Sequence, residues 1–158
     1  MNFIIVVVAL IVIVLLAGRL GLLSGKQPQG LGVADGRLKR LPRTPNCVSS
    51  QADLWPDAPQ RDFARIAPIP LVGDGPATIA KLAGIVETMP GASIIERKPD
   101  YLYAQFTSAM MKYVDDVELW FDPQANVIQV RSASRVGRKD FGVNRARIEA
   151  IRERLSQA

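Results

Sequence analysis

The first 23 residues constrain this chain more than any other feature. Phe3–Ala17 are fifteen consecutive apolar residues, and the apolar character resumes after Gly18 and Arg19 as far as Leu23. A helix over Phe3–Leu23 would be about 30 Å long, which matches the hydrocarbon core of a bilayer. The sequence therefore predicts a single-pass transmembrane anchor over residues 1–23 and a membrane location. The alternative is a cleaved signal peptide, which would need a basic start and a small-residue cleavage site.

Composition excludes several kinds of active site. The chain has no histidine, so Ser-His-Asp triads, Cys-His dyads and His-ligated zinc cannot form within it. Cys47 is the single cysteine and cannot form an internal disulfide. No P-loop, GxGxxG or GxSxG pattern is present. We expect no metal and no cofactor, and an enzyme would have to use carboxylates, serine, lysine or arginine.

The net charge of +5 is unevenly distributed. Residues 19–43 hold six basic residues and one acidic residue, residues 44–130 six and eleven, and residues 131–158 eight and three. A basic block beside an apolar segment favours contact with anionic lipid headgroups. No aromatic residues are interleaved with the basic ones, so nucleic acid is not an expected partner. The expected partners are the lipid bilayer and either an anionic ligand or a membrane-associated protein.

Residues 24–70 are predicted to form a proline-rich linker or strap. Seven prolines in this stretch leave little room for helix, because each lacks a backbone donor and restricts the preceding residue. Trp55, Phe63 and Ile66 favour a strap that lies on the domain. Cys47 falls in a predicted turn, and the absence of a histidine partner favours a packed thiol over a reactive one.

Residues 71–158 are predicted to form one α+β domain. Apolar residues recur at helical spacing in two segments, and four runs have strand character. The predicted order is helix Pro76–Thr88, strands Ser93–Arg97, Tyr101–Ser108, Tyr113–Asp122 and Val127–Arg135, then helix Val143–Ser156. This α-β-β-β-β-α order predicts a four-stranded antiparallel sheet with both helices on one face.

The register of the last hairpin follows from its four-residue loop. Pairing Asp122 with Val127 places Leu119 opposite Val130 and Asp115 opposite Ser134. The other face then pairs Glu118 with Arg131, which carry opposite charges. A shift of one residue would turn the apolar residues away from the core.

This register gathers polar residues at one end of the hairpin, beside the start of the last helix. We therefore predict an anion-binding site formed by Arg131, Ser132, Ser134, Arg135, Asp140, Asn144 and Arg145. The alternative is a network of ion pairs and helix caps in which Asp115 and Asp116 pair with Arg135 or Arg145. Asp115, Asp116 and Cys47 are secondary candidates. Asp115 and Asp116 point to opposite faces of the sheet, which argues against a shared metal.

Several segments resemble a known family. Thr44–Ser50, Asp115–Glu118 and especially Arg131–Gly137 followed by Asp140–Arg145 are similar to the bacterial and plastid domain-of-unknown-function family numbered 1499. The resemblance runs from about residue 32 to the C-terminus and implies membership without an activity. Leu41 stands where relatives often have a cysteine. Many members of this family look like exported proteins, so the resemblance implies an extracytoplasmic domain. The basic residues after the apolar run favour a cytoplasmic one.

Two functions remain open from the sequence. The first is a membrane-anchored accessory or binding domain that holds an anionic ligand or partner at the strand-to-helix corner. The second is a hydrolase-like enzyme that uses Asp115, Asp116 or Asp140 with Ser132 or Ser134. The first is favoured because nothing in the sequence activates a nucleophile.

Overall fold

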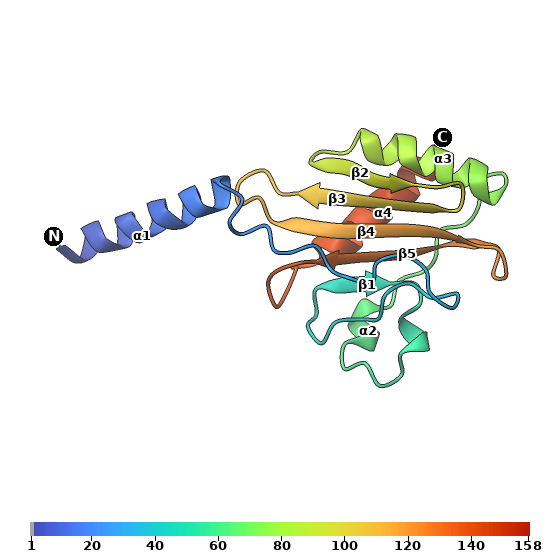
Figure 1. Ribbon diagram of the computed structural model, residues 1–158, viewed down its shortest axis with the longest axis horizontal. Coiled ribbons are helices and arrows are strands. Elements are labelled where there is room, and N and C mark those ends of the chain that lie inside the picture. The colour runs from blue at the N-terminus through green and yellow to red at the C-terminus, as the bar shows by residue number, and fades with distance from the viewer. Residues whose placement is uncertain (1) are drawn as a thin grey trace.

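The computed structural model describes residues 2–158, which form an α+β fold around one five-stranded antiparallel sheet (Figure 1). The strand order is β1-β5-β4-β3-β2. The strands are β1 (Cys47–Ser49), β2 (Ala92–Arg97), β3 (Tyr101–Thr107), β4 (Val114–Asp122) and β5 (Val127–Ser134). The predicted count of four strands is wrong, because β1 lies in the proline-rich stretch and pairs with β5. A strand of three residues is too short to show the alternation by which strands are recognised.

Two helices, α3 (Gly75–Glu87) and α4 (Val143–Ser156), cover one face of the sheet, hereafter the helix face. Helix α4 has the predicted bounds, and α3 begins and ends one residue earlier than predicted. The Asp74 carboxylate caps α3 by accepting from the Ala77 N–H at 2.7 Å. The main apolar core lies between the helices and this face and includes Ile79, Leu82, Val86, Leu102, Leu119, Ile128, Val130, Ile148, Ile151 and Leu155.

The register of the β4–β5 hairpin is as predicted. Asp122 pairs with Val127, Leu119 with Val130, and Asp115 with Ser134, while Glu118 pairs with Arg131 on the opposite face. The predicted register is therefore confirmed. Its physical cause is that only this pairing turns the apolar residues of both strands toward the helices.

The opposite face of the sheet is covered by residues 26–41, hereafter the strap, so we name it the strap face (Figure 1). The Gly32 N–H donates to Glu118 Oε1 at 2.7 Å, and Leu38 packs against aromatic side chains of β3 and β4. Beyond the strap, η1 (Ala52–Leu54) and α2 (Arg61–Ala64) flank β1. Ile69 and Ile128 then exchange backbone hydrogen bonds of 2.9 and 2.8 Å.

The N-terminal apolar segment forms helix α1 (Asn2–Arg19), which is shorter than the predicted span Phe3–Leu23. The helix ends because Gly21 is left-handed, with φ of 74°. The Gly21 N–H donates to Gly18 O at 2.9 Å and the Leu22 N–H to Ala17 O at 3.0 Å, which is a Schellman motif. Among residues 2–158, no helix has the length and apolar character needed to span a bilayer. The predicted transmembrane anchor and single-pass membrane location are therefore wrong.

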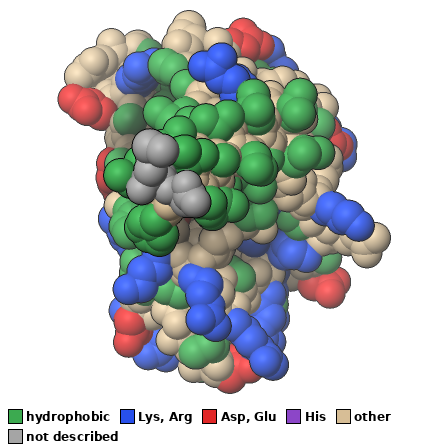
Figure 2. Space-filling model, turned by 90° about the vertical axis from the view of Figure 1, so that its left-hand side faces the viewer, with side chains coloured by type: hydrophobic (Ala, Val, Ile, Leu, Met, Phe, Trp, Pro, Cys, Tyr) green, Lys and Arg blue, Asp and Glu red, His purple; other side chains and the backbone are tan. Residues whose placement is uncertain are grey.

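Helix α1 extends away from the sheet, and most of its surface has no partner among residues 2–158 (Figure 1). The large apolar side chains from Phe3 to Leu16 are between 37% and 81% exposed. Seen along this end of the molecule, apolar side chains gather in the foreground and basic side chains lie below them (Figure 2).

Candidate functional site

The candidate residues meet at one corner of the molecule, where β4 begins, β5 ends and the chain turns into α4. Asp115 and Asp116 point to opposite faces of the sheet, as predicted. Asp115 lies on the helix face and Asp116 on the strap face, so the corner holds two separate polar clusters.

The cluster on the helix face is centred on Asn144, whose side chain is fully buried. Ser132 Oγ donates to Asn144 Oδ1 at 2.5 Å, and Asn144 Nδ2 donates to Ser134 Oγ at 2.9 Å. Asn144 Nδ2 also donates to the Asn46 carbonyl at 3.2 Å, which ties the chain just before β1 to α4. Ser132, Ser134 and Asn144, three residues of the predicted anion site, therefore lie together, and their side chains hydrogen-bond to one another.

Arg147 completes this cluster and was missed by the sequence analysis. Its Nη2 donates to Asp115 Oδ2 at 2.6 Å, and its Nη1 donates to Ser132 Oγ at 3.1 Å and Asn144 Oδ1 at 2.9 Å. The guanidinium carbon lies 4.6 Å from the centroid of the Phe106 ring. The sequence did contain a signal for Arg147. Leu155, Ile151 and Arg147 are four residues apart, so Arg147 lies on the same face of α4 as the two buried apolar residues.

The cluster on the strap face consists of two buried ion pairs. Arg135 donates to both Asp116 oxygens at 2.9 and 2.7 Å, and this hydrogen bonding raises the pKa of the guanidinium. Arg131 Nη1 lies 3.3 Å from Glu118 Oε2, with side chains 4% and 0% exposed. The strap covers this face, so Arg131 and Arg135 do not face the same space as Ser132 and Ser134.

Two tyrosines support these carboxylates. Tyr101 Oη donates to Glu118 Oε1 at 2.9 Å, and Tyr103 Oη donates to Asp116 Oδ1 at 2.6 Å. Burial and, for Tyr101, the nearby Glu118 charge raise the pKa of both phenols. The strap face therefore holds neutral tyrosine donors and paired charges.

Asp140 and Arg145 also act within the fold. Asp140 accepts from the Gly142 N–H at 3.1 Å and the Asn144 N–H at 3.0 Å, so it satisfies free donors at the start of α4. The N-cap position of α4 is Gly142, in a left-handed conformation. Arg145 points away from the corner and donates to carbonyl oxygens of residues 63 and 65 at 2.7 and 2.9 Å.

Cys47 lies on β1, with its side chain in a small apolar cluster beside Leu41 and Ala133. The residue is 1% exposed, and burial raises the pKa of the thiol. Cys47 is therefore a packed thiol and lies outside both polar clusters.

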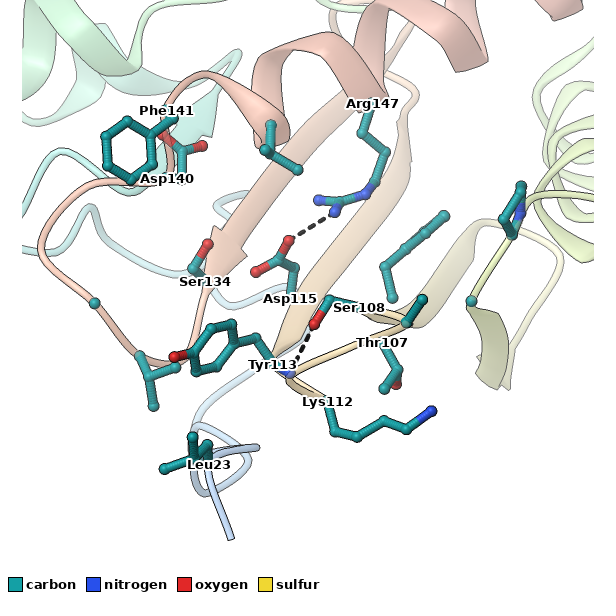
Figure 3. Close-up of a pocket in the computed structure, with 18 of the residues that line it drawn as sticks. Leu23, Thr107, Ser108, Lys112, Tyr113, Asp115, Ser134, Asp140, Phe141 and Arg147 are labelled. Carbon is teal, nitrogen blue, oxygen red and sulfur yellow. Dashed lines mark hydrogen bonds and ion pairs between the residues drawn. The ribbon is translucent and has the colours of Figure 1, made fainter. Parts of the chain in front are cut away.

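Beside the helix-face cluster is a cleft of about 1300 Å³, which we name the corner cleft (Figure 3). It lies between the end of α3, the β3–β4 loop, the start of α4 and the chain after α1. The chain after α1 comes close to the end of β5 at Gly25. Only glycine fits there, because a Cβ would lie 2.8 Å from the Arg135 Cβ. The apolar lining includes Leu22, Leu23, Met89, Phe106, Val136 and Phe141.

Charged side chains of the cleft lie at two levels. The Asp115–Arg147 pair forms the floor, with side chains only 13% and 10% exposed. Lys112 and Lys139 also line the cleft, and Lys98 is the lysine that forms an ion pair among residues 2–158. Asp140 lines the cleft as well, with its carboxylate held by the Gly142 and Asn144 N–H groups. The cleft therefore offers apolar walls, a paired floor, this capping carboxylate and two lysines without a carboxylate partner in the described part of the chain.

The arrangement does not resemble an activated nucleophile. In the described residues, Ser132 and Ser134 bond through their hydroxyls to the Asn144 amide and the Arg147 guanidinium, neither of which is a general base. No group of three or more Cys, Asp or Glu side chains within residues 2–158 is placed to hold a metal ion.

Comparison with known proteins gives one finding. A family model described as "Protein of unknown function (DUF1499)" matches residues 37–155. No curated protein and no solved structure matches the chain.

Proposed function

The chain belongs to the DUF1499 family of proteins of unknown function, and because that name carries no activity, we propose a function from the corner cleft. We propose that the domain binds a small anionic amphiphile in this cleft without converting it. The apolar walls hold the hydrocarbon part of the ligand, and the anionic group lies at Lys112 and Lys139. Like the hypothesis from the sequence, this proposal is a binding function. It differs in placing the anion at these two lysines and not at the buried arginines.

The observation that carries the proposal is the combination of an apolar cleft and free cationic side chains. A cleft of about 1300 Å³ is large enough for a small molecule, and most of its exposed lining is apolar. Arg131 and Arg135 are occupied by buried carboxylates, so an added anion there would have to displace Asp116 or Glu118. Lys112 and Lys139 have no such competitor among residues 2–158.

Calorimetric titration with decanoate tests the proposal. We expect saturable binding to the wild-type protein below the critical micelle concentration of decanoate. Ala146→Trp should abolish binding, because Ala146 is an exposed residue of α4 that lines the cleft and an indole there would fill it. The matched control is Ala77→Trp, at an exposed alanine in the first turn of α3 outside the cleft.

A second pair of measurements tests the placement of the charge. Replacing both Lys112 and Lys139 with Gln should weaken decanoate binding about tenfold, because each charge contributes up to about 1 kcal/mol near a surface. Binding of decanol, which lacks the negative charge, should stay unchanged. Equal binding of decanoate by the wild type and by Ala146→Trp would rule out the cleft as the site.

A further inference from the structure

Two polar groups in the corner cleft have hydrogen-bonding capacity that no residue in the range 2–158 uses. Asp115 Oδ2 accepts from Arg147, whereas Asp115 Oδ1 receives no donor from the described residues. Ser134 Oγ accepts from Asn144 Nδ2, and the Ser134 hydroxyl hydrogen has no acceptor in the same range. The cleft therefore presents one free acceptor and one free donor.

These two groups are neighbours. Asp115 and Ser134 are directly paired across β4 and β5, which places their Cβ atoms about 5 Å apart on the same face. Both side chains line the cleft. Figure 3 shows them side by side, with the bond from Asp115 to Arg147 on the side away from Ser134. The free carboxylate oxygen therefore lies on the Ser134 side.

A free acceptor beside a free donor favours a ligand hydroxyl, which donates one hydrogen bond and accepts another. A ligand carboxylate has no hydrogen to donate to Asp115 Oδ1. A ligand ammonium has no lone pair to accept the hydrogen bond of the Ser134 hydroxyl. A methyl group at this point would leave both protein groups without a partner, and a buried polar group that loses its partner is costly.

We propose that the corner cleft selects an anionic amphiphile with a hydroxyl at the far end of its hydrocarbon chain. The hydroxyl donates to Asp115 Oδ1 and accepts from Ser134 Oγ, while the anionic group stays at Lys112 and Lys139. This inference rests on the proposed function and adds the class of ligand to it. Arg147 acts as a positioning residue, because it holds Asp115 Oδ2 and turns the other oxygen to the cleft.

The experiment compares octanoate, decanoate and dodecanoate with their ω-hydroxy derivatives by calorimetry, all below their critical micelle concentrations. We expect the ω-hydroxy acid to bind about tenfold more tightly than its parent at the chain length that spans the cleft. Two hydrogen bonds of ordinary net strength account for a preference of this size. Without these hydrogen bonds, the added hydroxyl would weaken binding to an apolar wall.

Two neighbouring serines provide a matched pair of variants. Ser134→Ala should remove the preference for the ω-hydroxy acid over its parent acid. Ser132→Ala should keep the preference, because Ser132 lies on the same strand and face but does not line the cleft. Asp115→Asn tests the acceptor independently and should also reduce the preference, with Arg147 still able to donate to the amide oxygen.

Each outcome separates this inference from the proposed function. If the parent acids bind and the ω-hydroxy acids bind equally or more weakly at all three lengths, the hydroxyl site is wrong and the binding function stands. If the preference persists in both Ser134→Ala and Asp115→Asn, the hydroxyl does not lie at these residues and the inference is overturned. If no acid of either series binds, the proposed function fails and the inference fails with it.

Discussion

The two faces of the sheet are buried to a similar extent by different means. On the helix face, Leu119 is 1% exposed and belongs to the apolar core with α3 and α4. On the strap face, its neighbour Glu118 is 0% exposed and is held by Arg131, Tyr101 and the Gly32 N–H. Two adjacent residues of β4 are therefore equally buried, although one is apolar and the other is charged.

This difference shows what each cover requires. Helices bring apolar side chains and satisfy their own backbone groups, so the helix face away from the polar cluster around Asn144 needs only matching shape and volume. The strap has little regular structure, so its backbone groups need partners from the sheet, as the Gly32 N–H finds in Glu118. We expect the helix face to tolerate changes that conserve volume and the strap face to fail on changes that conserve shape but remove a charge.

The largest effect is expected for Glu118→Gln. The new side chain has nearly the same shape, but it leaves the buried Arg131 charge without a carboxylate partner. We expect a loss of about 3 to 5 kcal/mol in the free energy of unfolding, measured by urea denaturation. The double variant Glu118→Gln with Arg131→Met should recover most of this loss, because it removes the unpaired charge and keeps a side-chain oxygen that accepts from the Gly32 N–H and the Tyr101 hydroxyl. A loss below about 1 kcal/mol for Glu118→Gln would contradict the contrast between the faces.

A smaller effect is expected for Leu119→Met, one position further along the same strand. This change keeps the volume and apolar character of a core side chain, so we expect a loss below about 1.5 kcal/mol. Leu119→Ala is the matched variant that removes volume, and its expected loss is about 3 kcal/mol. The same urea measurement applies. If Leu119→Met costs as much as Glu118→Gln, the two faces do not differ in the way proposed.

The smallest effect is expected from alkaline pH and concerns the strap face alone. The pKa of Tyr101 is raised in the folded protein by burial and by Glu118, whereas the same phenol in the unfolded chain ionises near pH 10. Above pH 10 the unfolded state therefore binds fewer protons than the folded state, and stability falls as pH rises. The urea midpoint measured from pH 8 to pH 11 should show this fall.

Tyr101→Phe should reduce the dependence on pH between pH 10 and pH 11. Tyr113→Phe serves as the control, because Tyr113 is 41% exposed and its hydroxyl forms no hydrogen bond with residues 2–158. An identical pH profile for the wild type and Tyr101→Phe would show that the phenol does not stabilise the strap face.

Much of the domain could be read from the sequence. Both helices and four strands were predicted within about one residue of their bounds, and the register from Asp115 to Asp122 was confirmed. These elements are long enough for the spacing of apolar residues to repeat, and a repeat identifies both the element and its buried side. The length of α1 was wrong, although Gly21 carried a recognisable helix-stop signal.

The candidate site was predicted less well. The sequence grouped seven polar residues because they lie near one end of a hairpin, but Arg131 and Arg135 face the strap while Ser132 and Ser134 face α4. Arg145 donates to the carbonyl oxygens of residues 63 and 65, and Arg147 pairs with Asp115 instead. Long side chains choose among several partners within reach, so their pairing depends on which elements pack nearby.

The sequence by itself determined the local periodicity, and with it the α+β class, the sheet register and the family resemblance. Only the tertiary structure decided that β1 joins the sheet, that the strap covers its second face and that the corner cleft opens between four distant segments. The physical reason is the range of the interactions. Hydrophobic spacing acts within one element, whereas a short strand, a buried ion pair or a cleft exists only when segments far apart in the chain meet.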